Sequence, residues 1–417
     1  MSNNINESGL IFNGLVKAND PLVMLKNKLN FEKIKNECIN KKTTSTRGRK
    51  GYGLDFHIAA HILKYTYNLS DDRLAEDIAQ KPVFQYFCGF PSFDPNLKIN
   101  PTTFSKFRKR FGADNFDIIF RESIIINGPK AIEKNVIQDT TVENKDISFP
   151  TDTNLILDIY EMIIKIKYAT GIRLRDLYSN DIAELKRTIR FGYNKKSVDK
   201  CNKAKIKLKT TVKKLLRDLE RSLQRAGYYE EYKDSIELFG KVLNQTRDSK
   251  NKIYSLEEQD VYCVAKGKVN CKYEYGFKVG IAIGEENTVI LGNICCKENI
   301  HDSKIAPQVL DHVESMVGVR PENSYQDRGF RGAEDPKGTI MHFPDNPCLK
   351  DSPEIVASKI YHFKRRSAIE AVISNLKRFH GLGRDYLKGY YGSNINLKSA
   401  CIGYNVSKFL SSCKKII

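Results

Sequence analysis

Long apolar runs, signal sequences and nucleotide-binding glycine patterns are missing from this 417-residue sequence. No apolar run approaches the roughly 18 residues that a membrane-spanning helix needs. The start of the chain, MSNNINESGLIFNGLV, lacks the basic residues and the cleavage site of a secretory signal peptide. There is also no nucleophilic serine elbow, no P-loop and no Rossmann glycine pattern. These absences predict a cytoplasmic protein without membrane contact.

Closely spaced cysteines are missing as well. The ten cysteines are scattered, unlike those of a disulfide-stapled secreted domain. Cys263, Cys271, Cys295 and Cys296 come nearest to a cluster, but no CxxC pair is present. Structural zinc sites are usually built from such pairs. We therefore expect buried strand cysteines in a reducing compartment, and no zinc.

Acidic residues are too few to balance the basic ones. The chain has 69 Lys and Arg residues against 50 Asp and Glu residues, a formal net charge of +19. Such an excess favours a polyanionic partner, of which nucleic acid is the commonest. A hydrophobic content of 41% is enough to bury real cores. The length favours two or three domains.

Residues 1–130 have the pattern of short helices and predict an N-terminal helical domain. LDFHIAAHILKYTYN (54–68) has apolar residues at helical spacing, and Ser70 is a predicted N-cap for DDRLAEDIA. Asn100, as N-cap, and Pro101 predict the start of a third, basic helix. This order is compatible with a DNA-binding module of helix-turn-helix type, or with a bundle that has a solvated basic face. The basic residues are Lys106, Arg108, Lys109 and Arg110.

From residue 131 the pattern changes to strands, which a helical segment at about 155–250 interrupts. VIQDTTV (136–142) predicts a buried strand that carries Asp139. Between residues 186 and 225, 15 basic residues face three acidic ones, which favours contact with DNA over a merely solvated helix face. An apolar seam at spacings of three and four predicts a long amphipathic helix here. It consists of Leu208, Val212, Leu215, Leu219 and Leu223.

After the helical segment the strand pattern returns. KYEYGFKVGIAIG (272–284) and TVILGNICC (288–296) predict an antiparallel hairpin. The next predicted elements are a helix at 303–316, short strands at 322–330 and 338–343, and a long helix that holds Glu370. With the insertion removed, this order predicts an α/β fold, a mixed sheet flanked by helices.

Three carboxylates stand in distinctive places in this order. Asp139 lies in the middle of a strand, Asp327 lies at the carboxyl end of a strand, and Glu370 lies on the last predicted helix. In open α/β sheets, sites form at the carboxyl ends of strands. Gathered carboxylates repel one another unless a cation joins them. Because oxygen ligands suit Mg²⁺ or Mn²⁺, these acids point to metal-dependent chemistry on phosphodiesters.

Two motifs surround the second and third of these acids. Residues 327–330 read DRGF, and Arg366, Glu370 and Lys377 share one line along the last predicted helix. Both motifs resemble those of insertion-sequence transposases of the DDE type, D-x-G-[FY] and Y-x2-R-x3-E-x6-K. Phe363 takes the tyrosine position, which removes a phenolic hydroxyl.

The resemblance implies a fold and an activity for the chain. Residues 131–417 would form an RNase H-like catalytic domain, in which Asp139 takes the place of the first acid and holds Mg²⁺ or Mn²⁺ with Asp327 and Glu370. The enzyme would cleave double-stranded DNA at the terminal inverted repeats of a mobile element and transfer strands to target DNA. It would act as a homodimer at the bacterial nucleoid. The cations expected to contact DNA are Arg366, Lys377 and Arg378, besides Lys106, Arg108, Lys109 and Arg110.

Plainer interpretations stand beside these. Arg366 and Glu370 are spaced for an i,i+4 salt bridge of about 0.2–0.5 kcal/mol. His301 and Asp302 are placed at the start of a predicted helix, where they would act as an N-cap. The alternative is that His301 acts as a general base in catalysis. His380 follows the last motif and is a candidate for DNA contact. Acids near the proline-containing loop read as solvated turn residues. They are Asp335, Asp345, Asp351 and Glu354.

Two other functions remain open from the sequence. A domesticated or decayed transposase would bind DNA and do nothing more. An RNase H-like nuclease would hydrolyse DNA without joining strands.

Overall fold

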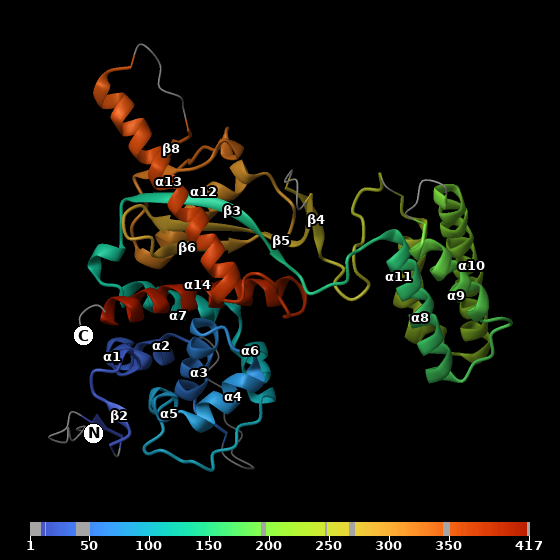
Figure 1. Cartoon of the computed structure of the whole chain (residues 1–417), viewed down its shortest axis with the longest axis horizontal. Coiled ribbons are helices and arrows are strands. Elements are labelled where there is room, and N and C mark those ends of the chain that lie inside the picture. The colour runs from blue at the N-terminus through green and yellow to red at the C-terminus, as the bar shows by residue number, and fades with distance from the viewer. Residues whose placement is uncertain are drawn as a thin grey trace. The chain divides into compact units, whose positions relative to one another are not determined.

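The computed structural model describes residues 10–12, 14–38, 51–192, 197–246, 248–266, 272–344 and 351–414, with the backbone alone at 362 and 363. The chain divides into two compact units, of which residues 146–263 form the second (Figure 1). The expected insertion at 155–250 falls inside this second unit. The N-terminal helices, expected as a domain over residues 1–130, share the first unit with the sheet.

The N-terminal part of the first unit is helical, apart from a small two-stranded sheet. The predicted N-cap of α4 is confirmed, because Ser70 Oγ accepts the backbone N–H of Arg73 at 3.0 Å. α6 begins one residue later than predicted, although Asn100 Oδ1 still accepts the backbone N–H of Thr102 at 3.0 Å. The described elements are β1 (Leu10–Ile11), β2 (Val16–Lys17), α1 (Pro21–Lys28), α2 (Phe31–Glu37), α3 (Leu54–Thr66), α4 (Asp71–Gln80), α5 (Pro82–Phe87), α6 (Thr102–Phe111) and α7 (Ala113–Ile125).

The first unit also contains a mixed sheet. Its described strands are β3 (Asn135–Asn144), β4 (Tyr262–Ala265), β5 (Tyr273–Gly284), β6 (Ile290–Cys295), β7 (Asn323–Tyr325) and β8 (Ile340–His342). The hydrogen-bonded order is β4, β5, β3, β7 and β8, and β6 also pairs with β5. β5 is antiparallel to both β3 and β6, which confirms the predicted hairpin. β3, β7 and β8 are parallel to one another.

Helices cover both faces of this sheet (Figure 1). They are α12 (Asp302–Val317), α13 (Pro353–Phe379) and α14 (Gly389–Lys414). α12 packs closely on one face, because a Cβ at Gly280 would lie 2.6 Å from Val309 Cγ2. On the other face, α13 packs against β3, and Asn396 of α14 donates to Glu143 Oε1 at 2.6 Å. The predicted mixed α/β sheet flanked by helices is confirmed.

The second unit consists of helices around a core of its own. The described helices are α8 (Asp152–Thr170), α9 (Ser179–Arg190), α10 (Val198–Ala226) and α11 (Tyr229–Asn244). The predicted apolar seam lies on α10, and all of its residues are buried. They pack against apolar side chains of α8, α9 and α11, including Ile159, Ile182 and Phe239. The long amphipathic helix expected from the sequence is therefore confirmed.

Candidate active site

Two of the predicted acids, Asp139 and Asp327, come from neighbouring parallel strands. In the pairing of β3 with β7, Ile137 stands opposite Tyr325. Asp139 lies two residues after Ile137, and Asp327 lies two residues after Tyr325. Because side chains alternate along an extended chain, both acids point to the same side of the sheet. The negative charge of Asp327 raises the pKa of Asp139, as expected for two acids that this pairing places next to each other. They form an acid pair at the carboxyl end of β7.

The pKa of Asp139 is raised to about 6. Burial of the carboxyl group is the main cause, and the negative charge of Asp327 adds to it. Three interactions lower the pKa: the backbone N–H of Thr140, which donates to Oδ1 at 2.7 Å, and the charges of Lys266 and Arg366. A divalent cation would relieve the repulsion between the two carboxylates. The acid pair therefore fits Mg²⁺ or Mn²⁺ in both donor type and charge.

Gly329 of the DRGF motif lies between two carboxylates. Its backbone N–H donates to Asp327 Oδ1 at 2.8 Å. A Cβ at this position would lie 3.0 Å from Asp327 Oδ1 and 3.7 Å from Asp302 Oδ2. Asp302, in the first turn of α12, also pairs with Lys278 at 3.1 Å. Glycine thus leaves room for Asp302 to approach the acid pair, a proximity that no local sequence signal reveals.

Glu370 lies apart from the acid pair. Its side chain is 63% exposed, and its Oε1 lies 3.6 Å from Arg366 Nη2, the i,i+4 pairing that the plainer interpretation predicted. The positive charge of Arg366 also lowers the pKa of Asp139, so the same guanidinium pairs with Glu370 and acts on Asp139. Among the described side chains, no group of three or more His, Cys, Asp or Glu is placed to hold a metal ion. The fold thus brings two of the three predicted acids together.

The other predicted cations of α13 differ in their surroundings. Lys377 Nζ lies 3.6 Å from Glu274 Oε1 on β5, which gives it a carboxylate partner within the fold. Arg378 is exposed to solvent. The backbone of Phe363 belongs to α13, but its side chain lies outside the described atoms.

The basic helix α6 presents three of its four predicted cations to solvent. Lys106, Lys109 and Arg110 are exposed. Arg108 is buried and forms a two-pronged ion pair with Asp71 of α4, with Nη1 donating to Oδ1 at 2.9 Å. Arg108 therefore joins α6 to α4, in a pairing where the planar guanidinium matches the carboxylate.

The remaining candidates have structural roles in the fold. His301 is the N-cap of α12, as expected, and its Nδ1 accepts the backbone N–H of Ser303. His380 is buried, its Nδ1 lies 2.9 Å from the carbonyl oxygen of Tyr65, and burial lowers its pKa. Cys295 and Cys296 are buried, as expected, and Cys263 on β4 is half-buried. Cys271 lies outside the described residues.

One expectation about the loop acids is wrong. The side chain of Asp335 is fully buried and pairs with Arg320, whose Nε donates to Oδ2 at 2.8 Å. The cation removes the cost of burying this carboxylate, so it is not a solvated turn residue. Asp351 pairs with Lys359 at 2.9 Å, and Glu354 is exposed. Asp345 lies outside the described part of the chain.

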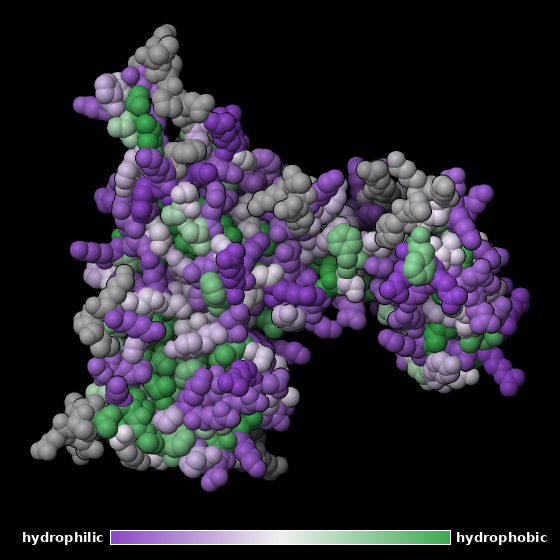
Figure 2. Space-filling view, viewed as in Figure 1, coloured by the Kyte–Doolittle hydropathy of each residue, from purple (hydrophilic) through white to green (hydrophobic). Residues whose placement is uncertain are grey.

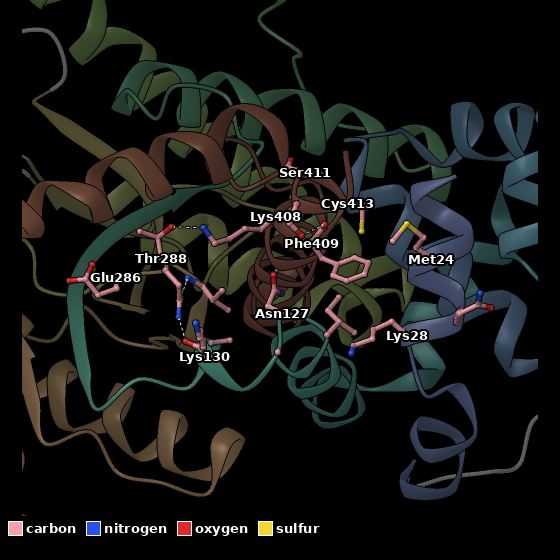
Figure 3. A pocket seen from close by; sticks show the side chains of 17 residues that line it. Met24, Lys28, Asn127, Lys130, Glu286, Thr288, Lys408, Phe409, Ser411 and Cys413 are labelled. Atoms are coloured by element: carbon pink, nitrogen blue, oxygen red, sulfur yellow. Dashed lines mark hydrogen bonds between the residues drawn. The ribbon is translucent and has the colours of Figure 1, made fainter. Parts of the chain in front are cut away.

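A pocket of about 950 Å³ lies beside the C-terminal part of α14 (Figure 3). Its walls come from the C-terminal ends of α1 and α14, the segment before β3 and the turn between β5 and β6. Lys28, Lys130 and Lys408 line it, and Lys408 Nζ donates to Thr288 Oγ1 at 2.9 Å. None of the predicted acids lines this pocket, because it lies at the end of the sheet where β3 begins.

Comparisons with known proteins point to a transposase family. Residues 11–110, which cover α1 to α5 and most of α6, match the family described as Transposase domain (DUF772). An uncharacterized protein of Rhizobium meliloti, ORF8 in the nfe locus, is 32% identical over 138 residues, which are 32% of this chain and 66% of that protein. The chain thus covers slightly less than two thirds of that relative. No solved structure matches the chain.

The match supports a transposase family for this chain. All three predicted acids lie outside residues 11–110, so the match concerns the helical region and not the acid pair. None of the described helices is both long enough and apolar enough to cross a membrane.

Proposed function

We propose that this chain is a DNA transposase that uses metal-dependent phosphoryl transfer to cut the ends of a mobile element and join them to target DNA. The observation that carries the proposal is the acid pair, Asp139 beside Asp327 on two parallel strands. The match of residues 11–110 to a transposase domain supports it independently.

The topology supports an RNase H-like catalytic region. The antiparallel strands β3, β5 and β6 are followed by α12 and then by β7 and β8, which are parallel to β3. Helices cover both faces, and the acids lie on the first strand and after the strand that pairs in parallel with it. The order of sequence patterns predicted the mixed sheet and its flanking helices, and the parallel pairing of β3 with β7 adds to it.

In the proposed mechanism, Asp139 and Asp327 would hold Mg²⁺ or Mn²⁺ with their carboxylate oxygens. A bound ion would activate the attacking oxygen and stabilise the leaving oxygen of the phosphodiester. The Asp139 carboxyl must lose its proton before it can bind a cation, and Arg366 favours that loss. Arg366 would then exchange its contact with Glu370 for a phosphate of the bound DNA. The exposed Glu370 carboxylate would be released to act as the third acid.

DNA recognition is assigned to the N-terminal helices and α13. Lys106, Lys109 and Arg110 form an exposed basic end of α6 that suits the terminal inverted repeats. Arg378 is exposed near the end of α13 and suits a phosphate next to the cleavage site. Two element ends have to be held at once, so we propose a homodimer on DNA within the bacterial cytoplasm.

Substitutions at the acids test the proposal directly. Asp139→Asn, Asp327→Asn and Glu370→Gln should each keep DNA binding and lose Mg²⁺-dependent cleavage of a duplex that carries an element end. Glu354→Gln is the matched control, because Glu354 is an exposed acid on the same helix as Glu370. Cleavage that survives Asp139→Asn would refute the assignment.

A DNA-binding protein without catalysis is the second candidate. The observation that favours it is the Arg366–Glu370 pair, which keeps the third acid away from the other two. If the unchanged chain binds an element end but never cuts it with Mg²⁺ or Mn²⁺, this candidate is correct. Cut products that are never joined to a second duplex would instead identify an RNase H-like nuclease.

A further inference from the structure

Charge is distributed unevenly among the helices of the second unit. α11 has an acidic excess, with Glu230, Glu231, Asp234 and Glu237 against two lysines. α10 has the opposite excess, with Asp199, Asp218 and Glu220 as its acids. The basic residues of α10 are Lys200, Lys203, Lys205, Lys207, Lys209, Lys213, Lys214, Arg217, Arg221 and Arg225. The basic character of this unit is therefore concentrated on one helix.

Five of these cations form a row along the solvent side of α10. At 100° per residue they fall within about 80° of arc, opposite the buried apolar seam. From its first to its last residue the row rises about 27 Å, at 1.5 Å per residue. All five residues are exposed. This basic row consists of Lys203, Lys207, Lys214, Arg217 and Arg221.

The basic row is largely left without acidic partners. Arg221 lies 4.0 Å from Asp218, at the limit of an ion pair. Within the described residues, Lys203, Lys207, Lys214 and Arg217 have no carboxylate partner. Mutual repulsion along such a row is unfavourable, and a bound polyanion would remove it.

The composition of this face separates a nucleic acid from a protein partner. Protein interfaces usually have aromatic or other large apolar anchors at their centre. On α10 the large apolar side chains that are exposed are Val198 and Ile206, and the visible surface of this unit is predominantly hydrophilic (Figure 2). A straight row of cations without apolar anchors instead suits a regular line of phosphates.

From this geometry we infer that the basic row binds the phosphate backbone of duplex DNA without reading its base sequence. Between Lys203 and Arg221, Thr210 is the one residue besides the cations that lies within the same arc of the helix. The row thus has no Asn or Gln, the side chains that pair with adenine edges. Its role would be to hold the DNA near the protein while other residues select the site. The choice of DNA over RNA rests on the proposed function, whereas the phosphate-binding chemistry does not.

The test uses the full chain in EDTA, so that cleavage plays no part. The variant replaces Lys203, Lys207, Lys214 and Arg217 by Gln. Binding is measured by fluorescence anisotropy on two duplexes of unrelated sequence, each about three helical turns long, between about 50 and 200 mM salt. We expect the affinity for both duplexes to fall at least about tenfold at the lowest salt. The slope of log affinity against log salt should become shallower by about three to four, roughly 0.9 per lost phosphate contact.

The control variant replaces Lys233 and Lys241, two exposed lysines on the acidic helix α11, by Gln. It should leave both the affinity and the slope unchanged. If the four-site variant keeps the slope of log affinity against log salt, the inference is overturned. A loss of affinity for one of the two duplexes and not for the other would also overturn it. The same measurement is made on an RNA duplex. If the four-site variant loses affinity for the RNA duplex and not for the DNA duplexes, the choice of DNA is wrong. Because no step requires cleavage, failure of the proposed catalysis would leave this result intact, and failure here would leave the acid-pair experiment intact.

Discussion

The two units of the chain use their basic residues in opposite ways. In the first unit several cations are buried in ion pairs. Lys145 Nζ lies 2.8 Å from Asp385 Oδ2, with 2% and 0% of the two side chains exposed, and Arg108 is held by Asp71. In the second unit the basic row faces solvent with hardly any acidic partner. A net charge of +19 therefore does not locate a DNA-binding surface, because only exposed, unpaired cations can release counterions from DNA.

The largest effect should come from breaking the buried pair. Lys145→Ala leaves Asp385 buried without its cation, so we expect the free energy of unfolding to fall by about 3–5 kcal/mol in urea denaturation. Lys214→Ala, in the basic row, should change it by less than about 0.5 kcal/mol. The double variant Lys145→Met with Asp385→Leu should recover part of the loss, since no buried charge remains. Equal losses at Lys145 and Lys214 would contradict the contrast between the units.

Two adjacent cations on α6, the buried Arg108 and the exposed Lys109, should show the same contrast between a paired and a solvent-facing cation. Arg108→Gln removes one of the two cations that pair with Asp71, the other being Lys64 at 3.0 Å, and we expect a loss of stability of about 2–3 kcal/mol. Lys109→Gln should leave the stability unchanged but make the salt dependence of DNA binding shallower by about one unit of slope. Thermal unfolding and salt titrations of DNA binding separate the two effects. If Lys109→Gln lowers the melting temperature as much as Arg108→Gln, the assignment of Lys109 to DNA is wrong.

A smaller effect is expected at the glycine of the DRGF motif. In Gly329→Ala the added Cβ would lie 3.0 Å from Asp327 Oδ1, so that the carboxylate has to shift. We expect Mg²⁺-dependent cleavage to fall about tenfold, a change of about 1.4 kcal/mol in transition-state stabilisation. Gly240→Ala is the control, because a Cβ there has no heavy atom within 4 Å. Cleavage at the unchanged rate in Gly329→Ala would show that close approach at this position is not needed.

The smallest effect should appear in the pH dependence of stability without metal. The folded pKa of Asp139, about 6, lies above its ordinary value of 3.8, so its contribution to stability is present below pH 4 and is lost as the pH rises through about 6. Asp139→Asn should therefore raise the melting temperature at pH 8 and have little effect at pH 4. Addition of Mg²⁺ should reverse the order at pH 8, because only the unchanged chain gains the ion. If the difference in melting temperature between the unchanged chain and Asp139→Asn does not vary with pH, Asp139 does not titrate in this way.

Local patterns predicted much of the fold. The seam from Leu208 to Leu223 repeats at helical spacing, and burial of that stripe determines the long helix α10. The β5–β6 hairpin was equally visible, because two apolar runs flank a short polar turn. The four-residue strand β4 was not predicted, although the three-residue strands β7 and β8 fall inside predicted strands.

Pairings between distant residues could not be read from the sequence. Arg108 and Asp71 stand 37 positions apart, and no local rule distinguishes Arg108 from the exposed Lys109 beside it. Lys266 acts on Asp139 across more than a hundred residues of intervening chain. At the candidate site, Asp327 was predicted from its place at the carboxyl end of a strand, where sites form in open α/β sheets. Asp139 was predicted as an acid inside a strand and through the resemblance to DDE transposases. The local Arg366–Glu370 pair was also foreseen, through its i,i+4 spacing.

The pairing of β3 with β5 has a consequence for how the chain accommodates its second unit. Asn144, at the end of β3, stands opposite Gly276 on the adjacent antiparallel strand β5. The chain leaves the sheet after β3 and returns to it at β4, and β5 lies between these two strands in the sheet. The second unit is therefore inserted between two strands that both pair with β5. Evolution could lengthen, exchange or delete such an insertion without altering the strand register that aligns Asp139 with Asp327.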